Sequence, residues 1–271
     1  MVCIEQGEPL QHVLGYADFC GNRFSVNGSV LIPRPETEWL VDEGAKLMDD
    51  CIASDETQHK APHSPKRILD IGTGSGCIAI SLKLRLGDAY VEAWDISEEA
   101  LRTAQDNADA LKAEVVFRKR DALKAEEEGC SEEECLQGGA LVSSAPTGQA
   151  MDSINYSEAN ILAAPWDLIV SNPPYICDSE RSAMDDNVLL HEPHTALFVP
   201  DDDPLRFYRA IARYALLTLN IGGSLLFECN TRYAEATGTM LSDMGFEEVT
   251  VSDDCFNLPR FVRGRKNSHN Q

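Results

Sequence analysis

From Lys66 onward, apolar runs rich in β-forming residues alternate with stretches of helical periodicity. The strand-like runs are RILDIG, AYVEAWDIS, EVVFRKRDAL and WDLIVSNPP, and the helical stretches include CIAISLKLRLG and SEEALRTAQDNADAL. Such alternation indicates βαβ units, whose strands lie parallel in one sheet. Beyond Asn172 we expect a helix near residues 205–219, a buried strand GGSLLFEC, a helix through Met240 and a closing pair, FEEVTVSD and RFVRGRK. The short connection of that pair favours an antiparallel hairpin. The pattern predicts an α/β fold whose parallel sheet ends in an antiparallel strand.

Two segments interrupt this pattern. Residues 49–66 are polar, contain two prolines and lack apolar periodicity, so we interpret them as a loop. Residues 124–164 contain eight acidic residues, one basic residue and few large apolar ones. A segment of that composition buries too little apolar surface to offset its ordering entropy, so a disordered insertion is predicted. No internal repeat is present.

The overall charge argues against a polyanionic partner. The chain has 23 Lys and Arg against 45 Asp and Glu, a formal net charge of -22, and the insertion accounts for only about -7 of it. Four basic residues gather at 260–266, a region that fits a solvated final strand better than a nucleic-acid contact. The nine cysteines form no Cys-x-x-Cys pair and no zinc spacing, which favours a reducing compartment without a metal site. No membrane span, secretory signal or transit peptide is visible.

A glycine-rich loop follows the first strand of the parallel sheet, where open α/β sheets bind ligands. Its five residues are Gly72, Thr73, Gly74, Ser75 and Gly76, with Asp70 just upstream. A dinucleotide fingerprint needs glycine where this chain has Cys77, which opposes an NAD-dependent oxidoreductase. The form found here suits a nucleoside with an amino-acid tail, such as S-adenosylmethionine, because a Cβ would intrude on the approaching ligand. The alternative is a plain tight turn.

Acidic residues end the next two strands. Asp95 stands about twenty residues after the glycine loop, where a carboxylate can accept both ribose hydroxyls, and Ile96 beside it can pack on an adenine. In isolation Asp95 would be interpreted as the N-cap of the following helix. Asp121, at the end of the third strand, is a candidate acceptor for the adenine amino group, with a surface acid as the equal alternative.

The most informative motif is Ser171, Asn172, Pro173, Pro174 and Tyr175, which follows the apolar strand WDLIV. Consecutive prolines remove two backbone donors and leave carbonyl acceptors free. An amide nitrogen is a poor nucleophile because its lone pair is delocalised. If Asn172 Oδ1 and the Pro173 carbonyl accept its two N–H bonds, the lone pair turns toward a methyl sulfonium and the developing charge is stabilised. Tyr175 can lie against the planar substrate group. The alternative is an Asn-Pro turn that closes a strand.

These motifs together resemble the peptide chain release factor N5-glutamine methyltransferases, the HemK/PrmC family, from Gly7 to Lys266. GEPLQHVLGYADFCGNRFSV resembles the family's linker hairpin. The RPxTE signature is carried by Arg34, Pro35, Glu36, Thr37 and Glu38. DIGTGSGCIAI, DIS and NPPY resemble its cofactor and acceptor motifs, and HEPHTALF and LLFEC resemble later family positions, including Glu192 and Glu228.

The resemblance implies a seven-stranded Rossmann-like class I methyltransferase that uses S-adenosylmethionine. Residues 1–60 would form a hairpin, a linker and the first helix, and residues 61–271 the methyltransferase domain. Arg34, Glu36 and Thr37 would lie over the methionine end of the cofactor or the acceptor. From the residues alone, Thr37 and Glu38 also fit the first turn of the helix TEWLVDEGAKLMDD.

The implied reaction is methylation of the glutamine in the Gly-Gly-Gln motif of a release factor. Two departures from the family pattern are expected from the resemblance: the chain would lack most of the family's N-terminal helical domain, and VPDDDPLRFYRA would replace a glycine-bearing segment. We expect a monomer, and the resemblance favours mitochondria over the cytoplasm. The rivals are an N6-adenine methyltransferase and a non-catalytic cofactor-binding subunit. Cys77 and Cys177 are interpreted as packing residues.

Overall fold

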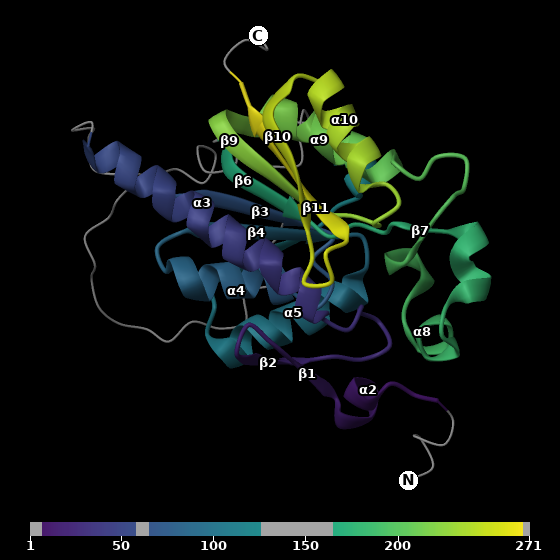
Figure 1. The fold of residues 1–271 in the computed structure, drawn as a ribbon. Coiled ribbons are helices and arrows are strands. Elements are labelled where there is room, and N and C mark those ends of the chain that lie inside the picture. Colours follow the sequence, from purple (N-terminus) through teal and green to yellow (C-terminus); the bar gives the residue numbers. More distant parts are fainter. Residues whose placement is uncertain (1–6, 58–64, 126–164, 268–271) are drawn as a thin grey trace, which may run out of the picture.

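A computed structural model describes residues 7–57, 65–125 and 165–267 (Figure 1). Among them, seven strands form one sheet in the order β10-β11-β9-β6-β3-β4-β5. The strands are β3 (Arg67–Ile71), β4 (Tyr90–Asp95), β5 (Val115–Lys119), β6 (Trp166–Ser171), β9 (Leu219–Glu228), β10 (Phe246–Asp253) and β11 (Pro259–Lys266). Neighbours from β5 to β9 pair in parallel. The α/β fold and its seven-stranded sheet are confirmed.

The antiparallel strand is not at the edge of the sheet. β11 pairs antiparallel with both β9 and β10, so β10 is the outermost strand on that side. The closing pair is a hairpin, as predicted. The expectation that the sheet ends in its antiparallel strand was wrong in space, because the last strand in the chain inserts between its two neighbours.

Helices cover both faces of the sheet (Figure 1). One face carries α3 (Glu38–Thr57), α4 (Cys77–Leu86) and α5 (Glu98–Leu111), and the other carries α9 (Arg206–Thr218) and α10 (Ala234–Asp243). Each face has its own apolar cluster. Since both faces are buried, central strands such as β3 and β6 are mostly apolar, which explains the near-continuous hydrophobic runs RILDI and WDLIV in the sequence.

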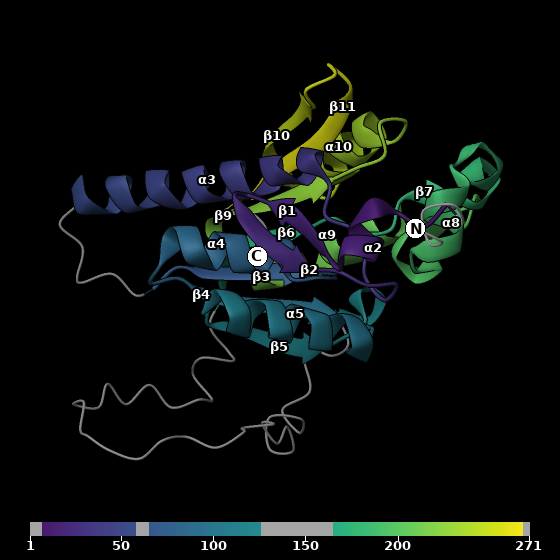
Figure 2. The same ribbon diagram turned by 90° about the horizontal axis from the view of Figure 1, so that it is seen from below.

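The N-terminal hairpin lies against the helices of the first face (Figure 2). It follows α2 (Leu10–Leu14) and consists of β1 (Tyr16–Phe19) and β2 (Asn22–Ser25). Cys20 and Gly21 form the turn with φ values of 48° and 73°, the conformation that a two-residue hairpin needs. Phe19 and Phe24 are buried in the same cluster as α3 and α4. The hairpin therefore shares a core with the sheet.

The predicted loop at residues 49–66 was partly wrong, because α3 continues to Thr57. No proline or glycine occurs between Asp49 and Pro62, and extending a formed helix fixes one residue for each hydrogen bond gained. Polarity was therefore a poor guide to the end of this helix. The predicted disordered insertion falls mainly on residues 126–164, which lie outside the described residues.

The segment that leads from β6 to α9 contains structure that the sequence did not predict. It contains β7 (Ile176–Cys177) and β8 (Phe198–Val199), which pair in parallel, and between them η4 (Asp178–Ala183), α8 (Asp186–His191) and η5 (His194–Ala196). Two short helical turns complete the described elements: η1 (Pro35–Thr37) and η2 (Ala122–Lys124). In the described part of the chain, no helix is long and apolar enough to cross a membrane.

Candidate active site

The glycine loop leaves β3 and leads directly into α4. Gly72, Gly74 and Gly76 have φ values of +77°, +54° and +80°, which favour glycine. A Cβ on Gly76 would lie 2.9 Å from Ile80 Cδ1 and 3.0 Å from Ala104 Cβ, so packing requires glycine there. A Cβ on Gly74 would meet nothing within 4 Å. The loop is therefore packed on one side and open to a ligand on the other.

Asp70 lies near the end of β3 and stabilises the glycine loop that follows. Its side chain is fully buried, and the Thr73 hydroxyl donates to Oδ2 at 2.6 Å. Burial raises the pKa of Asp70 to about 7, although the bond from Thr73 and the backbone N–H of Ala79 act in the opposite direction. The contacts seen for Asp70 are within the protein, and a direct contact with the cofactor stays a prediction.

Asp95 ends β4 and connects the glycine loop to the start of α5. Oδ2 accepts a 2.9 Å bond from the Gly74 N–H, and Oδ1 accepts another of 2.9 Å from the Ser97 N–H. Burial raises the pKa of Asp95, while these backbone bonds lower it. The N-cap interpretation of Asp95 was wrong, because Ser97 is the N-cap and accepts from Ala100 N. Beside it, Ile96 is 55% exposed despite being large and apolar.

Asp121 lies after β5, at the same edge of the sheet. Its Oδ1 accepts from the Leu123 N–H at 2.9 Å and so caps η2. This is a local structural role. The predicted contact with an adenine amino group stays a prediction.

The acceptor motif follows β6, which is the neighbour of β3 in the sheet. Ser171 is buried and donates from Oγ to the Ile71 carbonyl at 2.6 Å. The Asn172 carbonyl oxygen lies 4.0 Å from where a Cβ on Gly72 would stand. The glycine loop and the acceptor motif are thus adjacent because their parallel strands end side by side. Pro173 is buried, and Pro174 is half-buried.

The RPETE segment reaches the acceptor motif through Thr37. The Thr37 hydroxyl is buried and donates to Glu228 Oε2 at 2.7 Å. Asn172 Nδ2 lies 3.4 Å from Thr37 Oγ1 and donates to it. On the other side, the Tyr175 hydroxyl donates to Glu228 Oε1 at 3.3 Å. Three segments far apart in the chain therefore meet at one buried carboxylate.

The other charged residues of the RPETE segment have different partners. Arg34 pairs with Glu192 at 2.6 Å, and the Glu192 side chain is only 1% exposed. The Cys20 N–H donates to Glu38 at 2.8 Å, which ties the hairpin to α3. Glu36 is half-buried and close enough to Glu228 to raise its pKa. Thr37 is thus the member of the segment whose side chain contacts the acceptor motif.

Glu228 and Glu192 are the functional candidates that reasoning from residue chemistry missed. Glu228 ends β9 and is 1% exposed, and desolvation raises its pKa, opposed by the Thr37 hydroxyl, the charge of Arg260 and the Tyr175 hydroxyl. An acid directly after the apolar run SLLF was the available signal. Cys77 is buried in the apolar cluster of the first face, which confirms its interpretation as a packing residue. Cys177 is also buried, but its thiol donates to the Tyr233 hydroxyl at 3.3 Å, so its role is not packing alone.

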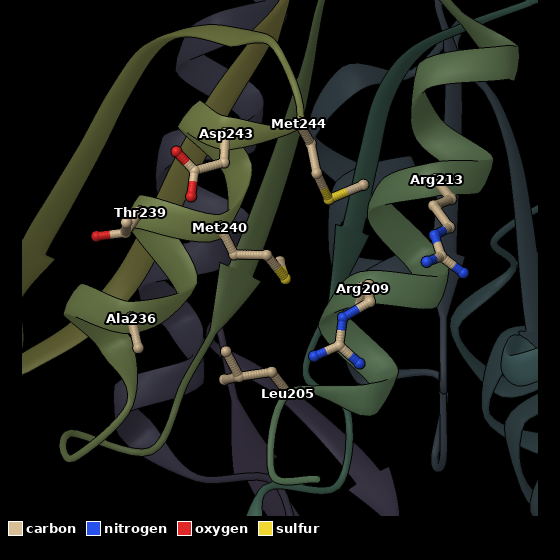
Figure 3. Close-up of a pocket in the computed structure, with 8 residues that line it drawn as sticks. All are labelled: Leu205, Arg209, Arg213, Ala236, Thr239, Met240, Asp243 and Met244. Carbon is tan, nitrogen blue, oxygen red and sulfur yellow. The ribbon is translucent and has the colours of Figure 1, made fainter.

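A separate groove of about 590 Å³ lies between α9 and α10 (Figure 3). None of its lining residues belongs to the motifs at the strand ends. They are Leu205, Arg209, Arg213, Ala236, Thr239, Met240, Asp243 and Met244. The groove is therefore not part of the candidate active site. Within the described residues, no group of His, Cys, Asp and Glu could hold a metal ion.

The residues at the strand ends fit S-adenosylmethionine. The open side of Gly74 leaves room for close approach of a ligand to the backbone. The half-buried Asp95 carboxylate suits ribose hydroxyls, and the exposed Ile96 offers an apolar surface to the base. Asn172 lies next to this loop, and its side chain contacts Thr37.

Comparison with known proteins indicates the family to which the chain belongs. A family model described as "Methyltransferase small domain" matches residues 38–131. The chain is 40% identical over 263 residues to the release factor glutamine methyltransferase of Bacteroides thetaiotaomicron, covering 97% of this chain and 78% of the relative. It is 34% identical to that of Flavobacterium psychrophilum, covering 96% and 76%.

Among solved structures, a methyltransferase from Pyrococcus furiosus has the same fold. The TM-score is 0.56 at 14% identity, over 98% of this chain and 99% of the other. Fold, site and sequence similarity lead to one conclusion: the chain belongs to the release factor glutamine methyltransferase family of S-adenosylmethionine-dependent enzymes.

Proposed function

We propose that this chain transfers the methyl group of S-adenosylmethionine to N5 of a glutamine side chain, within the Gly-Gly-Gln motif of a peptide chain release factor. The observation that carries the proposal is the contact of Thr37 with Asn172 beside the glycine loop. This contact joins the RPETE signature to the acceptor motif. The relatives named above are release factor glutamine methyltransferases, which supports the same substrate.

The residues at this site are suited to a planar amide. S-adenosylmethionine supplies an electrophilic methyl group when bound. Asn172 Oδ1 and the Pro173 carbonyl would accept the two N–H bonds of the glutamine, which directs the nitrogen lone pair out of conjugation and toward that methyl group. The same acceptors stabilise the positive charge that develops on nitrogen. No strong base is needed, because the proton becomes acidic after transfer and can leave to water.

The second candidate, methylation of adenine N6 in nucleic acid, requires similar acceptors. It is disfavoured by the net charge of -22 and by the ion pairing of the basic final strand. Arg260, Arg263 and Arg265 each pair with an acidic residue. They are therefore not a free basic strip for phosphate binding.

The test is transfer of a radiolabelled methyl group from S-adenosylmethionine to a panel of purified release factors, with DNA and RNA oligonucleotides as controls. We expect label in at least one release factor and none in the oligonucleotides. Label confined to an oligonucleotide would favour the adenine candidate and contradict the proposal.

We also propose that the chain acts as a monomer in mitochondria, as the family resemblance led us to expect. Light scattering during size-exclusion chromatography checks the first point, and fluorescence imaging of the tagged protein in cells checks the second. A stable dimer, or exclusively cytoplasmic fluorescence, would overturn the respective expectation.

A further inference from the structure

We infer that Glu228, acting through the Thr37 hydroxyl, fixes which way the Asn172 side-chain amide faces. This inference deepens the proposed function and rests on it. The starting point is that an asparagine amide has two different ends: one accepts hydrogen bonds and the other donates them. Only the oxygen end can accept the N–H bonds of a glutamine acceptor. A reversed Asn172 would present its own N–H groups to those of the substrate.

The Thr37 hydroxyl carries a single proton, and its position decides what Asn172 meets. Glu228 Oε2 lies 2.7 Å from Thr37 Oγ1, and an ionised carboxylate is an acceptor only. The proton of Thr37 is therefore directed to Glu228. The oxygen of Thr37 is left as an acceptor toward Asn172, 3.4 Å away, and it must meet Nδ2 rather than Oδ1. Asn172 Oδ1 is then on the side away from Thr37.

Burial raises the pKa of Glu228, and three neighbouring groups oppose that shift by stabilising the charged, accepting state. The Tyr175 hydroxyl donates to its second oxygen at 3.3 Å, so both oxygens receive a proton donor. The positive charge of Arg260 also stabilises the carboxylate, and Arg260 is itself held by Asp254 at 2.8 Å. Desolvation and the neighbouring Glu36 oppose ionisation. Because Glu228 acts on Asn172 through Thr37, we assign it a positioning role.

The decisive comparison is Thr37→Val, which removes the hydroxyl at nearly constant volume, against Thr37→Ser, which keeps it. We expect Thr37→Val to lower kcat for methylation of a Gly-Gly-Gln peptide about tenfold, the effect of losing one hydrogen bond, which corresponds to about 1.4 kcal/mol. Thr37→Ser restores most of kcat, and neither change alters S-adenosylmethionine affinity more than about twofold. Thr237→Val is the matched control: Thr237 is fully buried, and its hydroxyl donates to the Tyr233 carbonyl on α10. Its kcat should equal that of the wild type.

Glu228→Gln tests the origin of the effect. A glutamine has one accepting oxygen for two donating hydroxyls, so one of Thr37 and Tyr175 must face its NH₂ group. We expect Glu228→Gln to lower kcat, while the melting temperature of the protein with bound S-adenosylmethionine stays that of the wild type. A kcat within twofold of the wild type for Glu228→Gln would overturn the role assigned to Glu228.

A readout that does not depend on activity separates this inference from the proposed function. In protein labelled with ¹⁵N, the Asn172 side-chain NH₂ signal is assigned by its loss in Asn172→Asp. We expect this signal to shift in Thr37→Val and Glu228→Gln and to stay near the wild-type position in Thr37→Ser and Thr237→Val. If the Asn172 NH₂ signal keeps its wild-type position in Thr37→Val, the inference is overturned, even if the wild type methylates glutamine. Wild-type protein that transfers nothing to glutamine refutes the proposed function while the NMR comparison still tests the contact.

Discussion

Asp95, at the end of β4, is predicted to bind the cofactor and also accepts hydrogen bonds within the protein. Replacing Asp95 by alanine allows the two roles to be measured separately. The carboxylate accepts 2.9 Å bonds from the N–H groups of Gly74 and Ser97, so the protein already uses both of its oxygens. Hydrogen bonds to a charged group contribute about 1.5–3 kcal/mol each. Loss of the ribose contacts should weaken S-adenosylmethionine binding by the same amount, a roughly 10- to 150-fold rise in Kd. Loss of the two backbone contacts should also destabilise the fold by about 3–6 kcal/mol.

Calorimetric titration with S-adenosylmethionine measures the first effect, and urea unfolding without cofactor measures the second. Asp106→Ala is the control, since it removes the same charge from an exposed position on α5. Asp95→Asn keeps one accepting oxygen and should give intermediate values. If Asp95→Ala destabilised the fold but bound S-adenosylmethionine with wild-type affinity, Asp95 would be a brace for the glycine loop and not a cofactor ligand.

Three further predictions concern the remaining parts of the site. Asn172→Ala should lower kcat by roughly 10²–10³, the scale for losing one oxyanion-type contact, with S-adenosylmethionine affinity changed much less. Steady-state kinetics measures kcat, and calorimetry measures the affinity. A fall in kcat of less than tenfold would contradict the role of Asn172. Arg34→Ala removes the ion-pair partner of the buried Glu192 carboxylate, which keeps only the Ile32 N–H donor, and should cost about 3 kcal/mol of unfolding free energy. An unchanged urea midpoint would contradict this. Burial raises the pKa of Asp70 in the folded protein to about 7. The stability contributed by the protonated side chain is therefore complete below the ordinary pKa of aspartate and is lost as pH rises through about 7. The free energy of unfolding of Asp70→Asn, measured in urea, should therefore rise by about 3 kcal/mol relative to that of the wild type between about pH 5 and about pH 8. A difference in unfolding free energy that stays constant with pH would refute the raised pKa.

The sheet and the motifs at its carboxyl edge were predictable because their signals are local. Apolar runs such as RILDI and WDLIVS are strands buried on both faces, and the glycines after β3 have positive φ values. Parallel strands end at the same edge, so the order of the motifs along the chain was enough to place Gly74, Asp95 and Asn172 together. The spacing also carried enough information to separate this loop from a dinucleotide site.

The contacts that complete the site were not predictable from local pattern. Thr37 and Glu228 are 191 residues apart, and Arg34 and Glu192 are 158 apart. Neither hydrophobic periodicity nor turn chemistry indicates such pairs, because they depend on how α3 and the segment after β7 pack against the sheet. The length of α3 was misjudged for a related reason: polar residues do not end a helix unless a breaker or a competing contact is present.

The most direct test of the central claim is to locate the transferred methyl group. The chain is incubated with S-adenosylmethionine and a Gly-Gly-Gln peptide, or with a Gly-Gly-Glu peptide that lacks the amide, and the products are fragmented by tandem mass spectrometry. We expect one added methyl group on the glutamine side chain, none on the glutamate peptide, and almost none with Asn172→Ala. A methyl group on the backbone or on the glutamate peptide, or equal transfer by Asn172→Ala, would contradict the claim that Asn172 presents an amide nitrogen for methylation.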